Sequence, residues 1–176
     1  LQSRGLGDVY KRQILFAASE AVPFMKTGGL ADVTGSLPKY FDKKNYDVRV
    51  ILPKYVCMEE RWKGQLHFLC HFYVNLNWRK QYVGIFETTY DGITYYLVDN
   101  EFYFAGNAPY NNIYEDVEKF AFFSKAVLEA LPYLDFCPDI IHCHDWQTGL
   151  LPVFLRTLYG DEEYYTGCLL YTSPSP

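Results

Sequence analysis

The sequence predicts an α/β domain with a doubly wound, mostly parallel sheet that carries an antiparallel hairpin or meander. Three observations support this fold class. The apolar run Ile14–Ser19 shows no polar alternation, which is typical of a strand buried on both faces of a parallel sheet. A helical pattern and a second strand follow it, as in a strand–helix–strand unit. A later stretch rich in Tyr, Phe and Val contains the hairpin signal Asp91-Gly92.

The first unit runs from the strand at Ile14–Ser19 through a loop with Pro23 and two glycines. A helix is expected over Leu30–Phe41, with Leu30, Val33, Leu37 and Tyr40 on one face. Pro38 falls inside this pattern and is expected to end or kink the helix. The second strand is predicted at Asp47–Pro53, closed by its proline.

The remaining elements follow the same logic. Strands of the meander, which is inserted into the parallel sheet or lies at its edge, are expected over Gln65–Asn75, Gln81–Thr89 and Ile93–Asp99. A helix is predicted over Tyr114–Leu131, with a buried stripe at Phe120, Phe123, Val127 and Leu131. A further strand at Asp139–His144 and a helix at Thr148–Leu158 complete the unit.

The two ends of the chain show no folding pattern, but the DNA sequences that could encode them are complementary. Asp8–Gln13 can be encoded as GAT GTG TAT AAG AGA CAG, and the reverse complement, read one base in, encodes Cys168–Thr172. Extending both readings reproduces Arg4–Gly7 and Ser173–Pro176. This resembles a sequencing adaptor translated in opposite orientations, so residues 1–13 and 168–176 are predicted to be non-native. The native domain then spans 14–167 and is expected to be a fragment of a longer protein.

Composition narrows the class of protein. The 176 residues are 49% hydrophobic and 21% charged, which excludes a disordered tail, and no apolar run is long enough to span a bilayer. Without the two ends, 13 basic and 20 acidic residues leave a net charge of −7, which disfavours a nucleic-acid surface. The four remaining cysteines form no CxxC pair and no signal peptide is visible, so a cytoplasmic protein with reduced thiols is expected.

Two constellations could carry chemistry. Lys26-Thr27-Gly28-Gly29 follows the first strand and opens a helix, where free N–H groups, the helix dipole and a lysine suit a phosphate. An ordinary turn with a surface lysine is the alternative. At the end of the Asp139–His144 strand, His142 and His144 lie on one side of the strand. Zinc is disfavoured because no third ligand is near. A hydrogen bond to a sugar hydroxyl or phosphate is favoured, and a purely structural pair stays open.

Two acidic clusters carry weaker signals. Glu115-Asp116 begins the long helix, where carboxylates favour the helix dipole, so a structural role is the default. Asp99-Asn100-Glu101 is interpreted as a loop rather than a catalytic pair.

Five landmarks, in order, resemble the amino-terminal part of bacterial glycogen synthases and plant-type starch synthases. They are ILFAASEAVPFMKTGGLADVTGSLPK (14–39), VRVILPKY (48–55), YYLVDNEFYF (95–104), EKFAFFSKAVLEAL (118–131) and DIIHCHDWQTGLLP (139–152). The resemblance implies a GT-B fold of two Rossmann-like domains, of which this chain holds the amino-terminal one. It also implies a glycosyltransferase that retains the anomeric configuration. Such an enzyme transfers glucose from ADP-glucose to the non-reducing 4-hydroxyl of an α-1,4-glucan, with no essential metal or other cofactor.

The resemblance also implies site residues. Lys26, Gly28 and Gly29 are expected at the donor phosphates, Asp32 in the donor or catalytic site, and His144 at the transferred glucose. Glu115 is expected to bind substrate, although it stands where the family often has Asp and Lys119 stands where it often has Arg. Gln147 likewise stands in place of a frequent His.

The carboxyl-terminal nucleotide-binding domain of the family is missing from the chain, so the chain alone is predicted to be inactive. That half also reads the nucleotide base, which leaves ADP-glucose and UDP-glucose both open. The alternatives are a non-catalytic sugar- or nucleotide-binding module and a related GT-B transferase with another donor.

Overall fold

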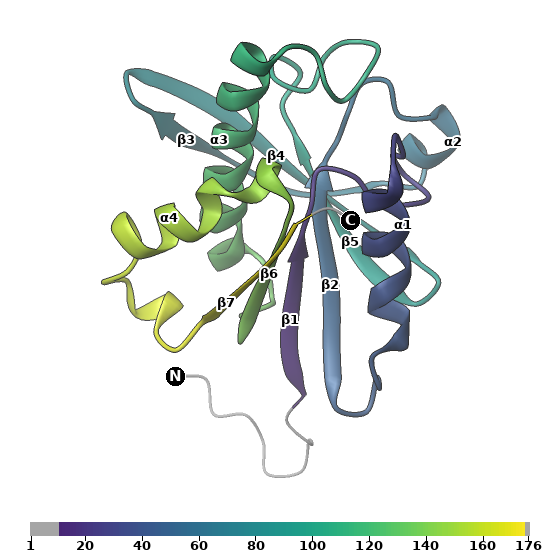
Figure 1. The fold of residues 1–176 in the computed structure, drawn as a ribbon, viewed down its shortest axis with the longest axis vertical. Coiled ribbons are helices and arrows are strands. Elements are labelled where there is room, and N and C mark those ends of the chain that lie inside the picture. Colours follow the sequence, from purple (N-terminus) through teal and green to yellow (C-terminus); the bar gives the residue numbers. More distant parts are fainter. Residues whose placement is uncertain (1–10, 175–176) are drawn as a thin grey trace.

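The computed structural model describes residues 11–174, in which helices cover both faces of a seven-stranded mixed sheet (Figure 1). The strand order across the sheet is β3-β4-β5-β2-β1-β6-β7. The strands are β1 (Arg12–Ala17), β2 (Tyr46–Pro53), β3 (His67–Leu76), β4 (Arg79–Tyr90), β5 (Ile93–Asp99), β6 (Ile140–His144) and β7 (Leu169–Ser173).

Five strands, β5-β2-β1-β6-β7, are parallel, and β1 lies in their middle with β2 and β6 as neighbours. The apolar run of β1 is buried on both faces, since Leu15 and Phe16 point to opposite sides and both are inaccessible to solvent. The predicted doubly wound, mostly parallel sheet is therefore confirmed.

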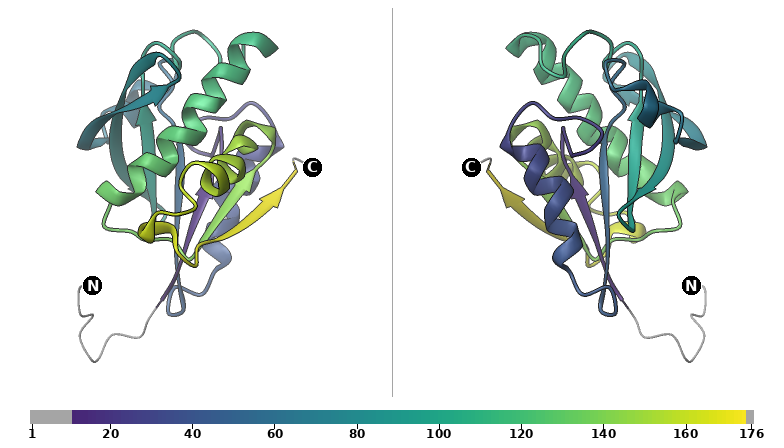
Figure 2. Two further views of the ribbon diagram at one scale, coloured as in Figure 1. Left: turned by 90° about the vertical axis from the view of Figure 1, so that its left-hand side faces the viewer. Right: turned by 90° about the vertical axis from the view of Figure 1, so that its right-hand side faces the viewer.

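The helices divide between the two faces of the sheet (Figure 2). One face carries α3 and α4, and the other carries α1. The α-helices are α1 (Gly29–Ser36), α2 (Glu60–Lys63), α3 (Ile113–Ala130) and α4 (Leu150–Thr157). The 3₁₀ turns are Leu37–Tyr40, Leu131–Tyr133, Trp146–Thr148 and Glu163–Tyr165. None of the helices described is long and apolar enough to cross a membrane.

The meander lies at one edge of the parallel sheet, where β4 pairs antiparallel with both β3 and β5. Asp91 and Gly92 form its turn with φ values of 51° and 71°. Positive φ at both central residues is the geometry of a type I′ turn, whose twist matches that of the strands. The predicted hairpin is confirmed, and it extends the parallel part of the sheet without interrupting it.

The predicted buried face of the first helix is wrong in part. Leu30 is buried, but Val33, Leu37 and Tyr40 are exposed, while Ala31, Thr34 and Gly35 face inward. The reason is a close approach of the helix to the preceding loop. A Cβ atom on Gly35 would lie 2.4 Å from Val22 Cγ2, so only small side chains fit this side. Pro38 ends the α-helix in a 3₁₀ turn, as predicted.

Part of the carboxyl-terminal segment 168–176, which the sequence predicts to be non-native, forms a strand. Leu169–Ser173 pairs parallel with the outer edge of β6, after a turn at Gly167 with φ 82°. An unpaired sheet edge presents a row of N–H and C=O groups, and a short stretch of strand-forming residues satisfies them regardless of its origin. Of the other predicted non-native residues, 1–10 and 175–176 lie outside the described part of the chain.

Candidate active site

The carboxyl ends of β1 and β6 are neighbours in the sheet, since Ala17 pairs with Cys143. The loop from β1 to α1 and the turn after His144 therefore begin side by side. Ligands of open α/β sheets bind at such strand ends. Of the sequence-predicted residues, Lys26 and Gly28 lie in the β1–α1 loop, Gly29 and Asp32 lie in the first turn of α1, and His144 is the last residue of β6.

The turn that opens α1 leaves its backbone available to a ligand. Gly28 is the N-cap in an extended conformation, and no side chain accepts a hydrogen bond from the first turn as a cap. A Cβ atom on Gly28 or Gly29 would meet nothing within 4 Å, so crowding inside the chain does not explain these glycines. Free N–H groups at a helix start, with the positive end of the helix dipole, suit an anionic group.

Lys26 and Asp32 are brought together across this turn. The lysine Nζ lies 2.7 Å from both carboxylate oxygens of Asp32, and both side chains are 54% exposed. An exposed pair of this kind stabilises a protein by only about 0.2–1 kcal/mol, so an incoming anion can take over the lysine at little cost.

Glu20 lies beneath the same turn and was missed by the sequence analysis. It is 3% exposed, and its carboxylate accepts hydrogen bonds from Thr27 N at 2.5 Å and Thr27 Oγ1 at 2.9 Å. Tyr110 donates from its hydroxyl to the other oxygen at 3.0 Å. The one available signal was a carboxylate directly after a fully apolar strand. Glu20 therefore fixes the backbone that carries Lys26 and Gly28.

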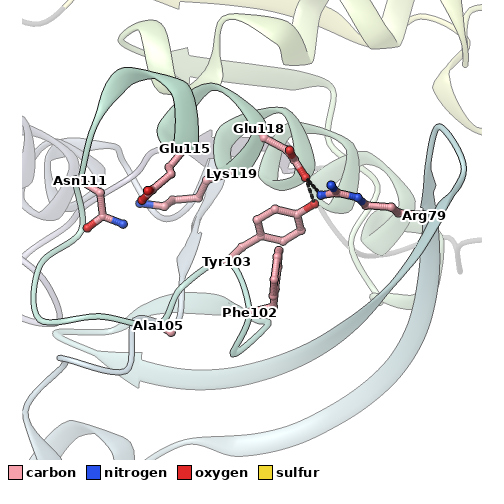
Figure 3. Close-up of a pocket in the computed structure, with 8 residues that line it drawn as sticks. All are labelled: Arg79, Phe102, Tyr103, Ala105, Asn111, Glu115, Glu118 and Lys119. Carbon is pink, nitrogen blue, oxygen red and sulfur yellow. Dashed lines mark hydrogen bonds and ion pairs between the residues drawn. The ribbon is translucent and has the colours of Figure 1, made fainter.

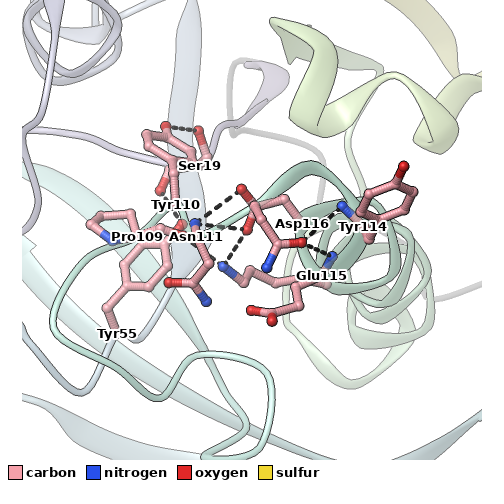
Figure 4. A network of polar contacts seen from close by, with 10 residues as sticks. Ser19, Tyr55, Pro109, Tyr110, Asn111, Tyr114, Glu115 and Asp116 are labelled. Atoms are coloured by element: carbon pink, nitrogen blue, oxygen red, sulfur yellow. Dashed lines mark hydrogen bonds and ion pairs between the residues drawn. The ribbon is translucent and has the colours of Figure 1, made fainter.

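Tyr110 connects this turn to the loop before α3. Its hydroxyl also lies 2.8 Å from Ser19 Oγ, as Figure 4 shows. Burial, together with the neighbouring Glu20 carboxylate, raises the pKa of Tyr110, so its hydroxyl keeps its proton at neutral pH and remains a donor. The 105–112 loop and the β1–α1 turn are thus held as one unit.

The two histidines stack at the end of β6, on the same side of the strand as predicted. Their ring centroids are 3.9 Å apart, and Ser173 Oγ lies 3.1 Å from His142 Nε2 and 3.3 Å from His144 Nδ1. Burial lowers the pKa of His142 to about 4. Burial and the neighbouring His142 lower that of His144 to about 3. Both rings are therefore neutral at pH 7.

His144 combines deep burial with an unused polar atom. The residue is 2% exposed, and its Nε2 has no hydrogen-bond partner within the part of the chain that the structure describes. The ring of Phe16 lies 4.9 Å away, centroid to centroid. Among residues 11–174, no three His, Cys, Asp or Glu side chains gather in a way that could hold a metal ion.

The residues after His144 have structural roles. Asp145, with φ 62°, caps the following turn by accepting from Trp146 N at 2.7 Å. Trp146 packs edge-on against Phe120, with ring centroids 5.4 Å apart. Gln147 is buried, and its Oε1 lacks a partner among the described residues.

Glu115 lies apart from these groups. It is exposed on the first turn of α3 and lines a cavity that none of Lys26, Asp32 or His144 lines (Figure 3). Its neighbour Asp116 is structural, as the default interpretation had it. The buried Asp116 carboxylate lies 2.7 Å from Lys119 Nζ, which also donates to Pro109 O.

Asp99 and Asn100, at the end of β5, are structural too. Asp99 forms an ion pair with Lys54 at 2.9 Å. The Asn100 side chain accepts from two backbone N–H groups of the following turn and donates to Tyr82 O. This loop holds the end of β5 and offers no catalytic pair.

Comparison with known proteins identifies the family. The model of the family described as "Starch synthase catalytic domain" matches residues 13–172. The chain is 65% identical over 156 residues to a "Glycogen synthase" of Lachnoclostridium phytofermentans, and 60% identical over 156 residues to one of Lachnospira eligens. Each match covers 89% of this chain and 33% of the relative, so the chain spans about a third of the length of these relatives.

A solved structure agrees with this assignment. The structure titled "Catalytic domain of Starch Synthase IV from Arabidopsis thaliana bound to ADP and acarbose" superposes with a TM-score of 0.79 at 28% identity. The match covers 93% of this chain and 34% of that one. The Rossmann-like fold of a GT-B glycosyltransferase is thereby confirmed. The chain belongs to the starch synthase catalytic domain family, which the glycogen synthases share.

Proposed function

We propose that this chain forms the amino-terminal wall of the active site of a retaining glucosyltransferase. The enzyme transfers glucose from ADP-glucose to the non-reducing 4-hydroxyl of an α-1,4-glucan. One observation carries the proposal: α1 starts at Gly28-Gly29 without a side-chain cap, beside Lys26, next to the strand end that carries His144. A diphosphate leaving group needs this combination of N–H donors and positive charge.

The charge that develops on the departing ADP is the feature to be stabilised. Lys26 can leave Asp32 for a phosphate oxygen, because both side chains are half-exposed and their pairing is weak. The Gly28 and Gly29 backbone can approach the same phosphate closely, because neither carries a side chain. Asp32, once released by Lys26, is left beside the donor, where it can accept from a hydroxyl group.

His144 acts as a neutral imidazole in this scheme. With a pKa lowered to about 3 by burial, it carries no charge at pH 7 and offers one ring N–H as donor. Its unpartnered Nε2 is the atom we assign to a hydroxyl or phosphate oxygen at the transferred glucose. His144 is 2% exposed and is covered partly by Ser173, which lies outside the proposed native domain 14–167, so substrate access to the ring in the whole enzyme depends on the residue that replaces Ser173.

We infer that a carboxyl-terminal nucleotide-binding domain completes the site. The chain matches only a third of its relatives' length, so the groups that would bind most of the nucleotide lie outside it. With one wall of the cleft, the leaving ADP is only partly stabilised. The isolated chain is therefore expected to have negligible transferase activity.

The test joins this chain to the carboxyl-terminal two-thirds of the Lachnoclostridium phytofermentans relative and measures transfer of labelled glucose from ADP-glucose to glycogen. We expect transfer by the fusion and none above background by the chain alone. Lys26→Ala should abolish transfer, whereas Lys39→Ala, a lysine paired with Asp91 in the fold, should preserve it. Transfer by the isolated chain, or equal activity of the two lysine variants, would refute the scheme.

We further propose that the native domain covers residues 14–167 and works in the cytoplasm. Its four cysteines, Cys57, Cys70, Cys137 and Cys143, are all free thiols, which suits a reducing compartment. The untrimmed DNA around the reading frame tests the boundaries, because adaptor sequence must replace the gene outside codons 14–167.

A further inference from the structure

The strand β3 forms one outer edge of the sheet, because β4 is its one neighbouring strand in the described part of the chain (Figure 1). An edge strand directs the N–H and C=O groups of alternate residues outward, where they can pair with a further strand. Folded proteins commonly protect such an edge with charged side chains, with proline, or by keeping the strand short. The ten residues of β3, HFLCHFYVNL, include no charged residue and no proline, so this edge lacks these protections.

Two local features limit where a further strand can pair with β3. The register of β3 against β4 shifts between Phe68 and Cys70, so a bulge interrupts the amino-terminal part of the strand. At the other end, the Lys125 ammonium donates to the Asn75 carbonyl oxygen at 2.6 Å. The regular stretch between these two features is 70–74, and Phe72 lies at its centre.

One face of β3 is buried, and the other is exposed and aromatic. Phe72 and Val74 belong to the core that β3 shares with α3. On the opposite face, His71 is exposed and Tyr73 is 50% exposed. The rings of His71 and Tyr73 each lie 6.0 Å from the ring of Tyr82 on β4, centroid to centroid. A strand added to β3 would therefore gain aromatic contacts as well as main-chain hydrogen bonds.

We propose that β3 pairs antiparallel with β3 of a second copy of this chain, so that the two sheets join across a two-fold axis. In the pair centred on Phe72, His71 of each copy lies opposite Tyr73 of the other. Side chains that lie opposite each other on neighbouring strands are in contact, so the exposed aromatic faces of the two copies become continuous. Each copy uses its β3 edge once, and the assembly therefore closes as a dimer.

The charges around β3 favour a second copy in the antiparallel orientation. A strand of other composition would be selected by complementary charges, and β3 itself offers none. The nearest cation is Lys80, which pairs with Asn75 in the register and lies 5.0 Å from the Tyr73 ring. In the antiparallel pair the two copies of Asn75 are six positions apart, which separates the two lysines by about 20 Å along the strands. A parallel pair in register would place the two lysines side by side, where they repel.

Apolar side chains at the same edge add to the interface. Phe68 is 52% exposed and Leu69 is 43% exposed, and Phe68 packs edge-on against Phe86 of β4 at 5.4 Å. In the pair centred on Phe72, Leu69 faces the end of the regular stretch of the other copy and loses contact with water there. One strand from each copy makes a small interface, so we expect a dimer with a micromolar Kd.

The test is sedimentation velocity of the 176-residue chain from about 1 to about 500 μM, with amide hydrogen exchange measured at both limits. We expect a monomer–dimer equilibrium and slower exchange over 71–73 at the higher concentration. Tyr73→Lys places a charge on the edge and should raise the Kd of the dimer about tenfold or more. Tyr40→Lys is the matched control, because it makes the same substitution at a side chain that is 84% exposed in the 3₁₀ turn after α1. It should leave the Kd unchanged.

The proposal fails if the chain stays monomeric, if exchange over 71–73 does not depend on concentration, or if the two lysine substitutions weaken the dimer equally. Circular dichroism shows whether each variant is folded, and the exchange measurement on the unsubstituted chain tests the edge even if Tyr73→Lys unfolds. The fusion with the carboxyl-terminal two-thirds of the relative should dimerise too, and a monomeric fusion would overturn the proposal for the whole enzyme. Because the pairing involves none of Lys26, Asp32 or His144, its failure is separate from failure of the transfer scheme.

Discussion

The buried carboxylate of Glu20 gives the sharpest test of how the phosphate-binding turn is held. Its two oxygens accept from Thr27 N, Thr27 Oγ1 and the Tyr110 hydroxyl. Glu20→Gln keeps the shape and replaces one acceptor oxygen by an NH₂ donor. The Thr27 N–H cannot turn away, so the remaining oxygen must face it. The NH₂ group must then face Tyr110, whose hydroxyl has to point its proton to Ser19 instead.

The magnitude follows from these contacts. Hydrogen bonds to a charged group stabilise by about 1.5–3 kcal/mol and neutral ones by about 0.5–1.5 kcal/mol. Glu20→Gln converts the Thr27 hydrogen bonds from bonds to a charged group into neutral ones, and it removes the bond that Tyr110 donates. It also removes the free-energy cost of burying a charge. We expect a net loss of about 2 kcal/mol, which in a chain of this size lowers Tm by roughly 4–8 °C.

The assay is urea unfolding of the purified chain, together with hydrogen exchange at the Thr27 amide. Tyr110→Phe is the matched control, because it removes one hydroxyl and leaves the Thr27 bonds to the carboxylate intact. It should cost about 1.5 kcal/mol, the lower end for one bond to a charged group, and leave Thr27 protected. The reasoning fails if Glu20→Gln unfolds at the wild-type urea concentration, or if Tyr110→Phe is the more damaging of the two.

Three further predictions concern His144 at the end of β6 and the first turns of α3. His144 has a pKa lowered to about 3 in the folded chain against about 6.5 when unfolded, so the unfolded state takes up the proton first and stability falls as pH drops below 6.5. By pH 5 this ring should cost about 2 kcal/mol, and His144→Gln should reduce the pH dependence of urea unfolding between pH 7 and pH 5 without abolishing it, because the pKa of His142 is also lowered, to about 4. Asn112→Ala removes the acceptor for Tyr114 N and Glu115 N at the start of α3, and should cost about 1 kcal/mol in thermal unfolding, with Asn112→Asp retaining most of it. Lys119→Met strands the buried Asp116 carboxylate and should cost about 3–5 kcal/mol, a loss that the double variant Lys119→Met/Asp116→Leu should largely recover if the stranded charge is its cause.

Most of the sheet could be predicted because its signals are local. The β1 run is apolar throughout, and β5 was predicted with the bounds it has, Ile93–Asp99. Asp91-Gly92 requires a backbone that few other dipeptides adopt, so it marks the turn without any knowledge of the rest of the chain. In each of these cases the residues that decide the structure are neighbours in the sequence.

The features that escaped prediction depend on distant contacts. Glu20 and Tyr110 are 90 residues apart, and neither one alone indicates that they share a hydrogen bond. The buried face of α1 was assigned by hydrophobicity, but the close approach of Gly35 to Val22 decides it in favour of small residues. The cavity that Glu115 lines also depends on distant contacts, because the loop after β5 and Arg79 of β4 form its other sides.

The edge strand β7 separates what the backbone determines from what the side chains determine. Pairing with β6 uses main-chain groups, which any strand-forming segment supplies, so it says nothing about the origin of Leu169–Ser173. The histidines differ, because both rings contact the Ser173 hydroxyl and are covered partly by this strand. If residues 168–176 are non-native, another side chain stands at this position in the natural enzyme. The burial that depresses the two histidine pKa values would then change, while the positions of His142 and His144 on β6, fixed by pairing with β1, would not.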